Sequence, residues 1–190
     1  MATTVAAENQ PDTVNKPIAF YLGAGLTLPA SPASFRNDHS AGINIYTALG
    51  YSVSPYTEIT GRLELHTVSL DTDTRFGDYI EFSGGGIDIL LIGADVRFST
   101  LRPAVTIRPF VTFGCGVSRL SQGNITTNLS FEQYAWLLFE NQTKLYFSLG
   151  VGFDFKPVAN TTMFLLVRYV SVSQDADNKI FLPITLGFKF

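Results

Sequence analysis

Apolar residues recur at every second position in eight separate segments of the chain. A period of two is the pattern of a β-strand that has one apolar face. It predicts strands at 18–28, 43–53, 59–65, 86–98, 105–117, 145–155, 163–169 and 180–190. A helical period competes in one connection at most, so the chain is predicted to be all-β.

The segment 86–98 departs from strict alternation. Its second half keeps apolar residues at even positions, whereas Ile87, Ile89 and Leu91 occupy odd positions. A β-bulge near Leu90 would bring both sets to one face, so a bulge is predicted there.

The connections between these strands differ in length. Short ones lie at 54–56, 99–103 and 157–161, and long ones at 29–40, 71–85, 119–142 and 173–179. In a simple up-and-down order, all short connections and both termini fall at one end. This layout is typical of a bacterial outer-membrane barrel.

The second face of each strand shows where the apolar face points. A soluble sandwich or lipocalin-like barrel would carry a solvated second face that is poor in glycine. Here that face combines small residues with tyrosines, as in Tyr21, Gly23 and Gly25, or Tyr146 and Gly150. Small and large side chains must alternate inside an eight-stranded barrel, so this face is predicted to point inward and the apolar face toward lipid.

Charged residues of the strands fall on the same second face. Unpaired charges there would be costly, so they are expected to pair across strands and with tyrosine hydroxyls. The predicted polar network of the interior consists of Arg62, Glu64, His66, Asp95, Arg97, Arg108, Asp154 and Arg168, and Lys156 and Lys189 share the same parity.

Composition narrows the class of protein. The 190 residues are 46% hydrophobic and mean hydropathy is +0.20, yet no continuous apolar stretch is long enough for a membrane-spanning helix. With 13 Lys+Arg against 16 Asp+Glu, no basic field exists to attract nucleic acid. The single cysteine, Cys115, excludes an intrachain disulfide, and no spacing suggests zinc; no cofactor is expected.

Several segments resemble the small OmpA-like and opacity-type outer-membrane barrels. They are 102–116, 150–155, 167–169 and the alternating C-terminus that ends in Phe190, and the likeness extends over 16–190. The resemblance implies an eight-stranded antiparallel up-and-down transmembrane β-barrel in the outer membrane of a Gram-negative-type bacterium, with both termini periplasmic. It also implies that Phe188 and Phe190 belong to the signal read by the barrel-insertion machinery. The peptidoglycan-binding domain of full-length OmpA-like proteins does not follow Phe190, so a cell-wall tether is not expected.

Two units are expected along the chain. Residues 1–16 are small and polar and are predicted to form a flexible periplasmic tail, in which Val5, Ala6 and Ala7 are compatible with the end of an export signal. Residues 17–190 are predicted to form the barrel.

Four features are candidates for specific chemistry. Glu64 and His66 could act as a carboxylate and base, but an interior ion pair that includes Arg62 is favoured. The acidic segment 71–85 could hold calcium, although its spacing matches no defined calcium loop, and a solvated acidic rim could instead share divalent ions with lipopolysaccharide. Cys115 is most simply a small lipid-facing residue.

The fourth candidate is the apolar stretch 129–139, in the longest connection. It could be an amphipathic helix, a strand extension or a partner-binding patch, and packing on the barrel rim is the simplest interpretation. Its apolar side chains include Tyr134, Trp136 and Leu138.

The leading functional hypothesis is a non-enzymatic outer-membrane protein whose loops interact with external molecules or support envelope integrity. One alternative is a narrow porin-like conduit for small or apolar solutes, as in OmpW-type barrels. Another is a structural subunit of a larger envelope complex. The expected partners are outer-membrane lipid, lipopolysaccharide, the insertion machinery, and an extracellular ligand or envelope protein.

Overall fold

The computed structural model describes residues 17–69, 82–84, 86–100, 106–122, 125–127, 142–158, 161–174 and 177–190. The predictions for the tail 1–16, for the acidic positions 71–81 and for Tyr134, Trp136 and Leu138 lie outside these residues.

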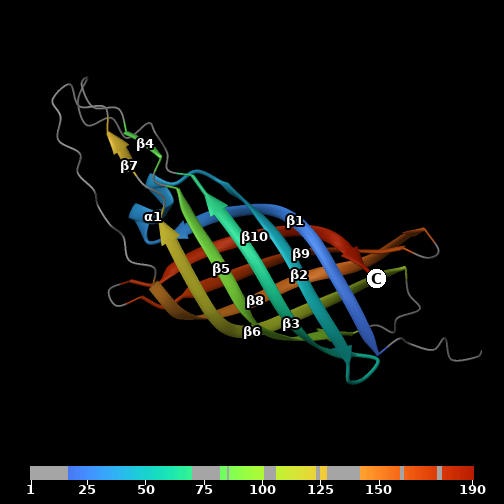
Figure 1. Ribbon diagram of the computed structural model, residues 1–190. Helices are drawn as coiled ribbons and strands as arrows, with labels where there is room; N and C mark the ends of the chain where they lie inside the picture. The colour runs from blue at the N-terminus through green and yellow to red at the C-terminus, as the bar shows by residue number, and fades with distance from the viewer. Residues whose placement is uncertain are drawn as a thin grey trace, which may run out of the picture.

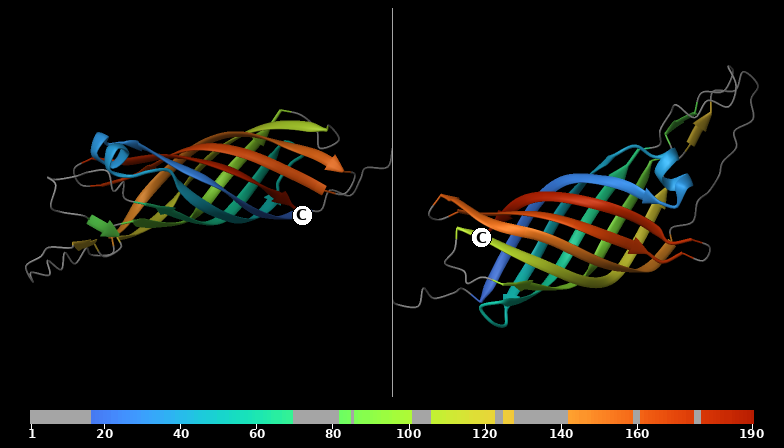
Figure 2. Two further views of the ribbon diagram at one scale, coloured as in Figure 1. Left: turned by 90° about the horizontal axis from the view of Figure 1, so that it is seen from above. Right: turned by 180° about the vertical axis from the view of Figure 1, so that it is seen from behind.

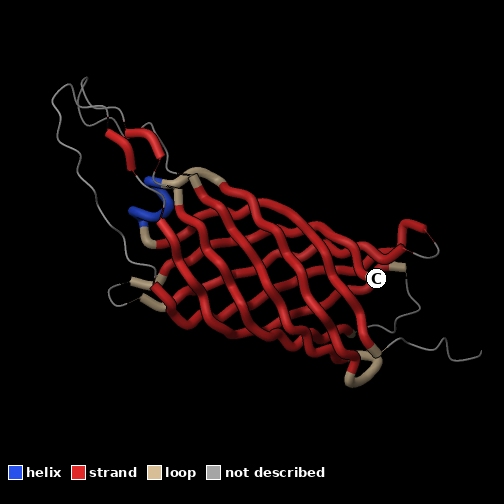
Figure 3. Tube along the Cα trace, in the orientation of Figure 1, coloured by secondary structure: helices blue, strands red, loops and turns tan. Residues whose placement is uncertain are grey.

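Eight strands form a closed antiparallel barrel (Figures 1 and 3). Strands that are consecutive around the barrel are also consecutive along the chain, and β10 pairs with β1 to close the ring, as in the register Leu22↔Phe188. The predicted eight-stranded, all-β, antiparallel up-and-down barrel is therefore confirmed. Its strands are β1 (Ile18–Ser31), β2 (Gly42–Ser52), β3 (Thr57–Val68), β5 (Ile87–Ser99), β6 (Ile107–Gln122), β8 (Gln142–Val158), β9 (Thr161–Val172) and β10 (Lys179–Lys189).

Three short elements lie at one end of the barrel, which we call the loop end. They are the helix α1 (Ala33–Asp38) and the strands β4 (Phe82–Gly84) and β7 (Ile125–Thr127), which pair in a two-stranded sheet. Both views of Figure 2 place them opposite the C-terminus. We call the opposite end, where β1 begins and β10 stops, the terminus end.

The helix α1 was not predicted, because the connection 29–40 has no helical period long enough to detect. A six-residue helix is unstable alone, and α1 has no side-chain cap hydrogen bond. Its Phe35 side chain is buried, with 3% of its surface exposed. Tertiary packing of one aromatic side chain against the barrel therefore stabilises this turn of helix.

The predicted bulge near Leu90 is wrong. Strand β5 pairs with β3 and with β6 in unbroken register, from Val68↔Ile87 to Thr57↔Phe98 on the β3 side. Ile87, Ile89 and Leu91 consequently point into the barrel and are buried. The apolar residues of β5 shift from even to odd positions in this half of the strand because the interior of the barrel becomes apolar toward the loop end.

The outer wall of the barrel is apolar, as the alternation predicted. Phe20, Leu49, Phe147 and Leu186 expose 41%, 60%, 64% and 47% of their surface. Because the ring is closed, the backbone N–H and C=O groups at both edges of each barrel strand face a neighbouring strand. A β-structure in hydrocarbon requires such pairing. An apolar exterior around a largely polar interior is the reverse of a soluble protein.

No helix among the described residues is long and apolar enough to cross a membrane.

Candidate functional site

The middle of the barrel contains four buried charges from three different strands. We call Arg62, Glu64, Asp95 and Arg168 the middle cluster. Arg62 donates from Nη1 to both carboxylate oxygens of Asp95, at 2.8 and 2.6 Å, and from Nη2 to Ser148 Oγ at 3.0 Å. Arg168 donates from Nη2 to Glu64, whose other oxygen lies 3.9 Å from Arg62 Nε. Two cations therefore face two carboxylates, and pairing offsets the cost of burying each charge.

Tyrosine rings cover the two arginines of this cluster. The Arg62 guanidinium lies 5.2 Å from the ring centroid of Tyr146, and that of Arg168 lies 5.4 Å from the ring of Tyr46. Cation–π contacts of this kind add stabilisation in a desolvated interior.

His66 lies next to the middle cluster, toward the loop end. Its Nε2 is 3.3 Å from Glu64 Oε1 and its Nδ1 is 2.7 Å from Thr27 Oγ1. A hydroxyl, an imidazole and a carboxylate in sequence resemble a nucleophile with its base and orienting group. However, all three residues have 0% exposed surface, so this arrangement offers no access to a substrate.

The loop end of the interior is closed by apolar side chains, which we call the apolar plug. The plug is topped by Phe35 of α1, against which His39 packs with ring centroids 5.1 Å apart. Burial of the His39 ring lowers its pKa below the usual value. The members of the plug are Phe35, Ile87, Ile89, Leu91, Leu120, Tyr146, Val170, Val172 and Phe181.

A second group of charges occupies the terminus end. Arg97 Nη2 lies 2.5 Å from Asp154 Oδ1, and Lys189 Nζ donates to Glu58 Oε2 at 2.7 Å. Tyr21 donates its hydroxyl to Glu58, which links the two ion pairs because Arg97 Nη1 lies 3.4 Å from the Tyr21 hydroxyl oxygen. We call these five residues the terminus-side cluster.

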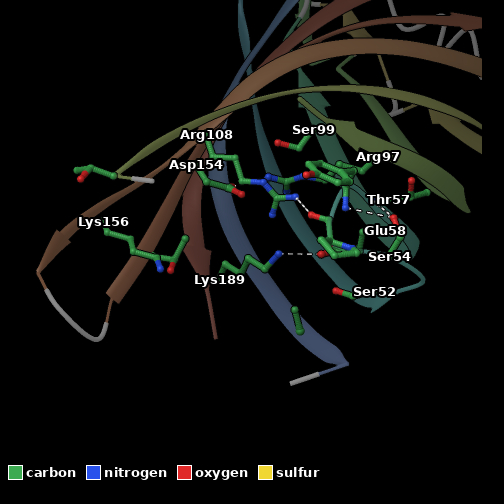
Figure 4. Close-up of a pocket in the computed structure, with 15 residues that line it drawn as sticks. Ser52, Ser54, Thr57, Glu58, Arg97, Ser99, Arg108, Asp154, Lys156 and Lys189 are labelled. Carbon is green, nitrogen blue, oxygen red and sulfur yellow. Dashed lines mark hydrogen bonds and ion pairs between the residues drawn. The ribbon is translucent and has the colours of Figure 1, made fainter. Parts of the chain in front are cut away.

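Four residues of the terminus-side cluster, Glu58, Arg97, Asp154 and Lys189, line a cavity of about 140 Å³, shown in Figure 4. Arg108 lies at its rim, half-buried, and donates from Nη2 to Pro55 O at 2.5 Å. Lys156, also in the lining, is exposed.

Inward-facing glycines lie where the interior holds its largest polar side chains. A Cβ on Gly150 would come within 2.5 Å of Arg168 Cγ, and one on Gly93 would collide with the Tyr146 hydroxyl. These close approaches explain why small residues share the inner face with Tyr and Arg.

The structure thus separates the eight predicted interior residues into two groups. Seven are buried, and Arg108 is half-buried at the rim of the cavity. Arg62, Glu64, His66, Asp95 and Arg168 come together in mid-barrel, whereas Arg97, Asp154 and Arg108 lie at the terminus end.

Sequence reasoning missed Glu58, Thr27 and Phe35. Glu58 has the parity of Arg62, but the predicted strand began at Ile59, one residue too late. Thr27 lies on the inner face already identified for β1, without a charge to mark it. Phe35 had no signal in the local pattern.

The C-terminal aromatics lie outward against the first strand. Phe190 exchanges backbone hydrogen bonds with Phe20 at 2.9 and 3.1 Å, and their rings stack with centroids 6.3 Å apart. Phe188 and Phe190 expose 42% and 68% of their surface.

Cys115 is a free, exposed thiol on the outer wall. Within the described ranges, no group of three His, Cys, Asp or Glu side chains is placed to hold a metal ion.

Together, the closed ring, the apolar outer wall and the ion-paired interior define the fold of the small transmembrane β-barrels of bacterial outer membranes. The resemblance found in the sequence is confirmed at the level of the fold.

Three solved structures are similar to the chain. Neisserial surface protein A is 12% identical, with a TM-score of 0.60 over 91% of this chain and 96% of that chain. Ail, the attachment invasion locus protein of Yersinia pestis in complex with the heparin analogue sucrose octasulfate, is 16% identical, with a TM-score of 0.52 over 91% and 97%. The outer membrane protein OprG from Pseudomonas aeruginosa is 11% identical, with a TM-score of 0.51 over 90% and 95%.

No protein-family model and no curated protein sequence matches the chain. At these identities the likeness shows the fold alone, and one fold serves several functions.

Proposed function

We propose that the chain is a non-enzymatic, non-conducting protein of the outer membrane of a Gram-negative-type bacterium that presents its loop end at the cell surface. Both termini then face the periplasm, as in the layout typical of such barrels. The observation that carries the proposal is the combination of an apolar outer wall with an interior filled by side chains.

The filled interior argues against the porin-like conduit. The apolar plug seals the loop end, and the middle cluster crosses the barrel below it with nearly complete burial. An eight-stranded barrel leaves an interior just wide enough for side chains, which here occupy it.

The burial of His66 supports the absence of catalysis. Thr27, His66 and Glu64 have the order of a catalytic triad, but all three side chains are fully buried in the interior of the barrel. A hydrolase would need this hydroxyl at an open surface.

The loop end is the surface most suited to contact with other molecules. The helix α1 and the β4–β7 sheet extend the chain beyond the strand ring there (Figure 1). The connection 71–81 adds Asp71, Asp73, Asp78 and Glu81 against one arginine. Such acidity favours divalent ions shared with lipopolysaccharide phosphates, or a basic partner, over a sulfated polyanion like the one in the Ail structure.

The terminal aromatics fit a role in assembly. Phe188 of β10 and Phe190, directly after this strand, are exposed on the outer wall, where insertion machinery could bind them. The segment with Tyr134, Trp136 and Leu138 retains its proposed role as a partner-binding patch, and burial of this patch in a larger envelope complex is the runner-up function.

Surface presentation can be tested with one epitope at two positions. We expect antibody to bind intact cells when the epitope follows Ser40, in the connection after α1, and to require permeabilised cells when the epitope precedes residue 17. Each variant serves as the expression control for the other, because both carry the same epitope. Labelling of the second variant on intact cells, or of neither position without permeabilisation, contradicts the proposed orientation.

Planar-bilayer recording separates the closed barrel from the conduit. The ion pairs and apolar plug fill the interior, so the refolded chain is expected to give no stable unitary current above that of an empty-detergent control. Reproducible unitary steps from the chain would establish a conduit instead.

A further inference from the structure

The helix α1 is attached to the barrel at both of its ends and covers the interior through one side chain. Before the helix, Ser31 still pairs with Ile180 of β10. After the helix, Ser40 N donates to Ser69 O at 3.1 Å. The six residues between these points form α1, at the loop end in Figure 1, and a helix of this length is not stable alone. Burial of Phe35 in the apolar plug therefore decides whether α1 stays docked.

Two polar side chains lie against the docked Phe35. The His39 ring packs on the Phe35 ring, with 5.1 Å between the centroids and 48° between the planes. His39 Nδ1 also lies 3.2 Å from Phe35 O, and because a carbonyl oxygen only accepts, Nδ1 carries the hydrogen. From β10, Lys179 Nζ lies 5.5 Å from the centroid of the Phe35 ring. His39 therefore contributes both a ring contact and a hydrogen bond to the docked helix.

The surroundings of His39 suit a neutral ring and not an imidazolium. With its hydrogen on Nδ1, the neutral ring leaves Nε2 as an acceptor. Nε2 is buried, and it has no hydrogen-bond partner among the residues that the structure describes. Protonation would place a second N–H at this buried position without an acceptor, which is costly. The docked position therefore disfavours the charged form of His39.

The charges around His39 do not remove this cost. Lys179 faces the ring from β10 and adds a second cation, whereas Asp38 of α1 favours the charged ring. Arg36, also in α1, is exposed and donates from Nε to Asn37 at 3.5 Å. Burial is the main reason that the pKa of His39 lies below its ordinary value, and Lys179 lowers it further. The bond to Phe35 O and Asp38 oppose this lowering only in part.

We propose that α1 is an acid-released cover of the apolar plug. Protonation of His39 drives its ring out of the contact with Phe35, and the segment between Ser31 and Ser40 then leaves the end of the barrel. Release uncovers the plug and adds an apolar surface to the loop end in acidic surroundings. The middle cluster still fills the barrel below the plug, so no channel opens. This device does not depend on which side of the membrane the loop end faces.

The direction of the pH dependence follows from proton linkage. His39 has its ordinary pKa of about 6.5 when released and a lower pKa when docked. The docked form binds fewer protons, so docking is favoured above about pH 6.5 and weakens as the pH falls. Release takes up one proton between the two pKa values. Each pH unit in that window therefore raises the ratio of released to docked helix about tenfold.

Hydrogen exchange of the refolded full chain tests the release. Amide protection, corrected for the intrinsic effect of pH on exchange, is measured in α1 and in β1 from about pH 7.5 to about pH 5, the range in which histidine titrates. The Arg36 amide reports on α1, because it donates to Pro32 O at 3.0 Å. We expect protection in α1 to fall by up to about tenfold per pH unit, while β1 stays protected. Constant protection of α1 overturns the proposal.

Three variants assign the effect to His39. His39→Phe keeps a ring beside Phe35, and His39→Asn keeps a side-chain donor near the position of Nδ1, but neither takes up a proton in this range. Both should hold the same α1 protection from about pH 7.5 to about pH 5. Lys179→Met keeps His39 but removes the facing cation, so the fall in protection should be smaller than in the unaltered chain.

The second histidine of the chain, His66, serves as the internal control because it is present in every variant. Heat-dependent mobility on gels shows that each variant has closed its barrel. If the fall in α1 protection persists unchanged in His39→Phe and His39→Asn, another group causes it and the proposal is wrong.

Discussion

Replacing Arg168 with methionine is expected to lower the free energy of unfolding by about 3–5 kcal/mol, because it removes the cation that donates to the buried Glu64 carboxylate and leaves the two carboxylates of the middle cluster facing Arg62 alone among its arginines. Arg168 has 1% of its surface exposed and donates to Glu64, which has none exposed. The variant also loses the contact with the Tyr46 ring. Equilibrium urea titration of the refolded chain in lipid, followed by heat-dependent gel mobility, measures the effect.

Two further variants isolate the cause of this loss. Arg119→Met removes an exposed arginine and should change the free energy of unfolding by no more than about 0.5 kcal/mol. The double variant Glu64→Gln/Arg168→Met removes the surplus carboxylate charge as well, so it should be more stable than Arg168→Met alone. If the double variant is as unstable as the sum of Arg168→Met and Glu64→Gln, each measured alone, the ion pair is not the source of the effect.

Replacing Leu149 with arginine is expected to cost about 2–4 kcal/mol, the cost of a cation at the bilayer midplane on the outer wall of a barrel. Leu149 lies near the middle of β8 and exposes 48% of its surface. In a soluble protein, an arginine at so exposed a position would be tolerated. The measurement is the same urea titration in lipid bilayers.

Leu145→Arg provides the matched control on the same strand and the same face. Leu145 exposes 60% of its surface and lies four residues closer to the loop end. With a rise of about 3.3 Å per residue and a tilt near 45°, this places it roughly 9 Å nearer the interface. The cost there should fall to about 0–1 kcal/mol. Equal costs at Leu145 and Leu149 would show that depth in a membrane is not what matters.

The barrel was predictable because its pattern repeats. Each strand carries the same alternation, and the charges Arg62, Glu64 and Asp95 all fall on the face that also holds the glycines. Residues on one face of neighbouring strands must meet inside a closed ring, so the interior position of these charges followed from periodicity alone.

Which charges pair was not predictable in the same way. Arg168 and Glu64 are separated by 104 positions and lie on strands that are not neighbours in the barrel. Their contact depends on side-chain reach across the interior, which a strand pattern does not encode. The division into a middle cluster and a terminus-side cluster has the same origin.

The apolar plug shows where the pattern misled. Ile87, Ile89 and Leu91 looked like outward residues displaced by a bulge, because an inner face was assumed to be polar along its whole length. The interior changes character toward the loop end, where Phe35 of α1 covers it. Neither the change nor the helix has a local signal, since both depend on packing between distant segments.

The apolar faces of the strands meet lipid in a transmembrane barrel, and the native cysteine allows the most direct test of this orientation. Cys115 lies at the middle of β6 on the outer wall, between Ala94 and Phe147 of the neighbouring strands. A spin label on Cys115, in the chain reconstituted in bilayers, should collide freely with oxygen and little with a water-soluble nickel complex. A label exposed mainly to the nickel complex, or shielded from both reagents, would contradict the account.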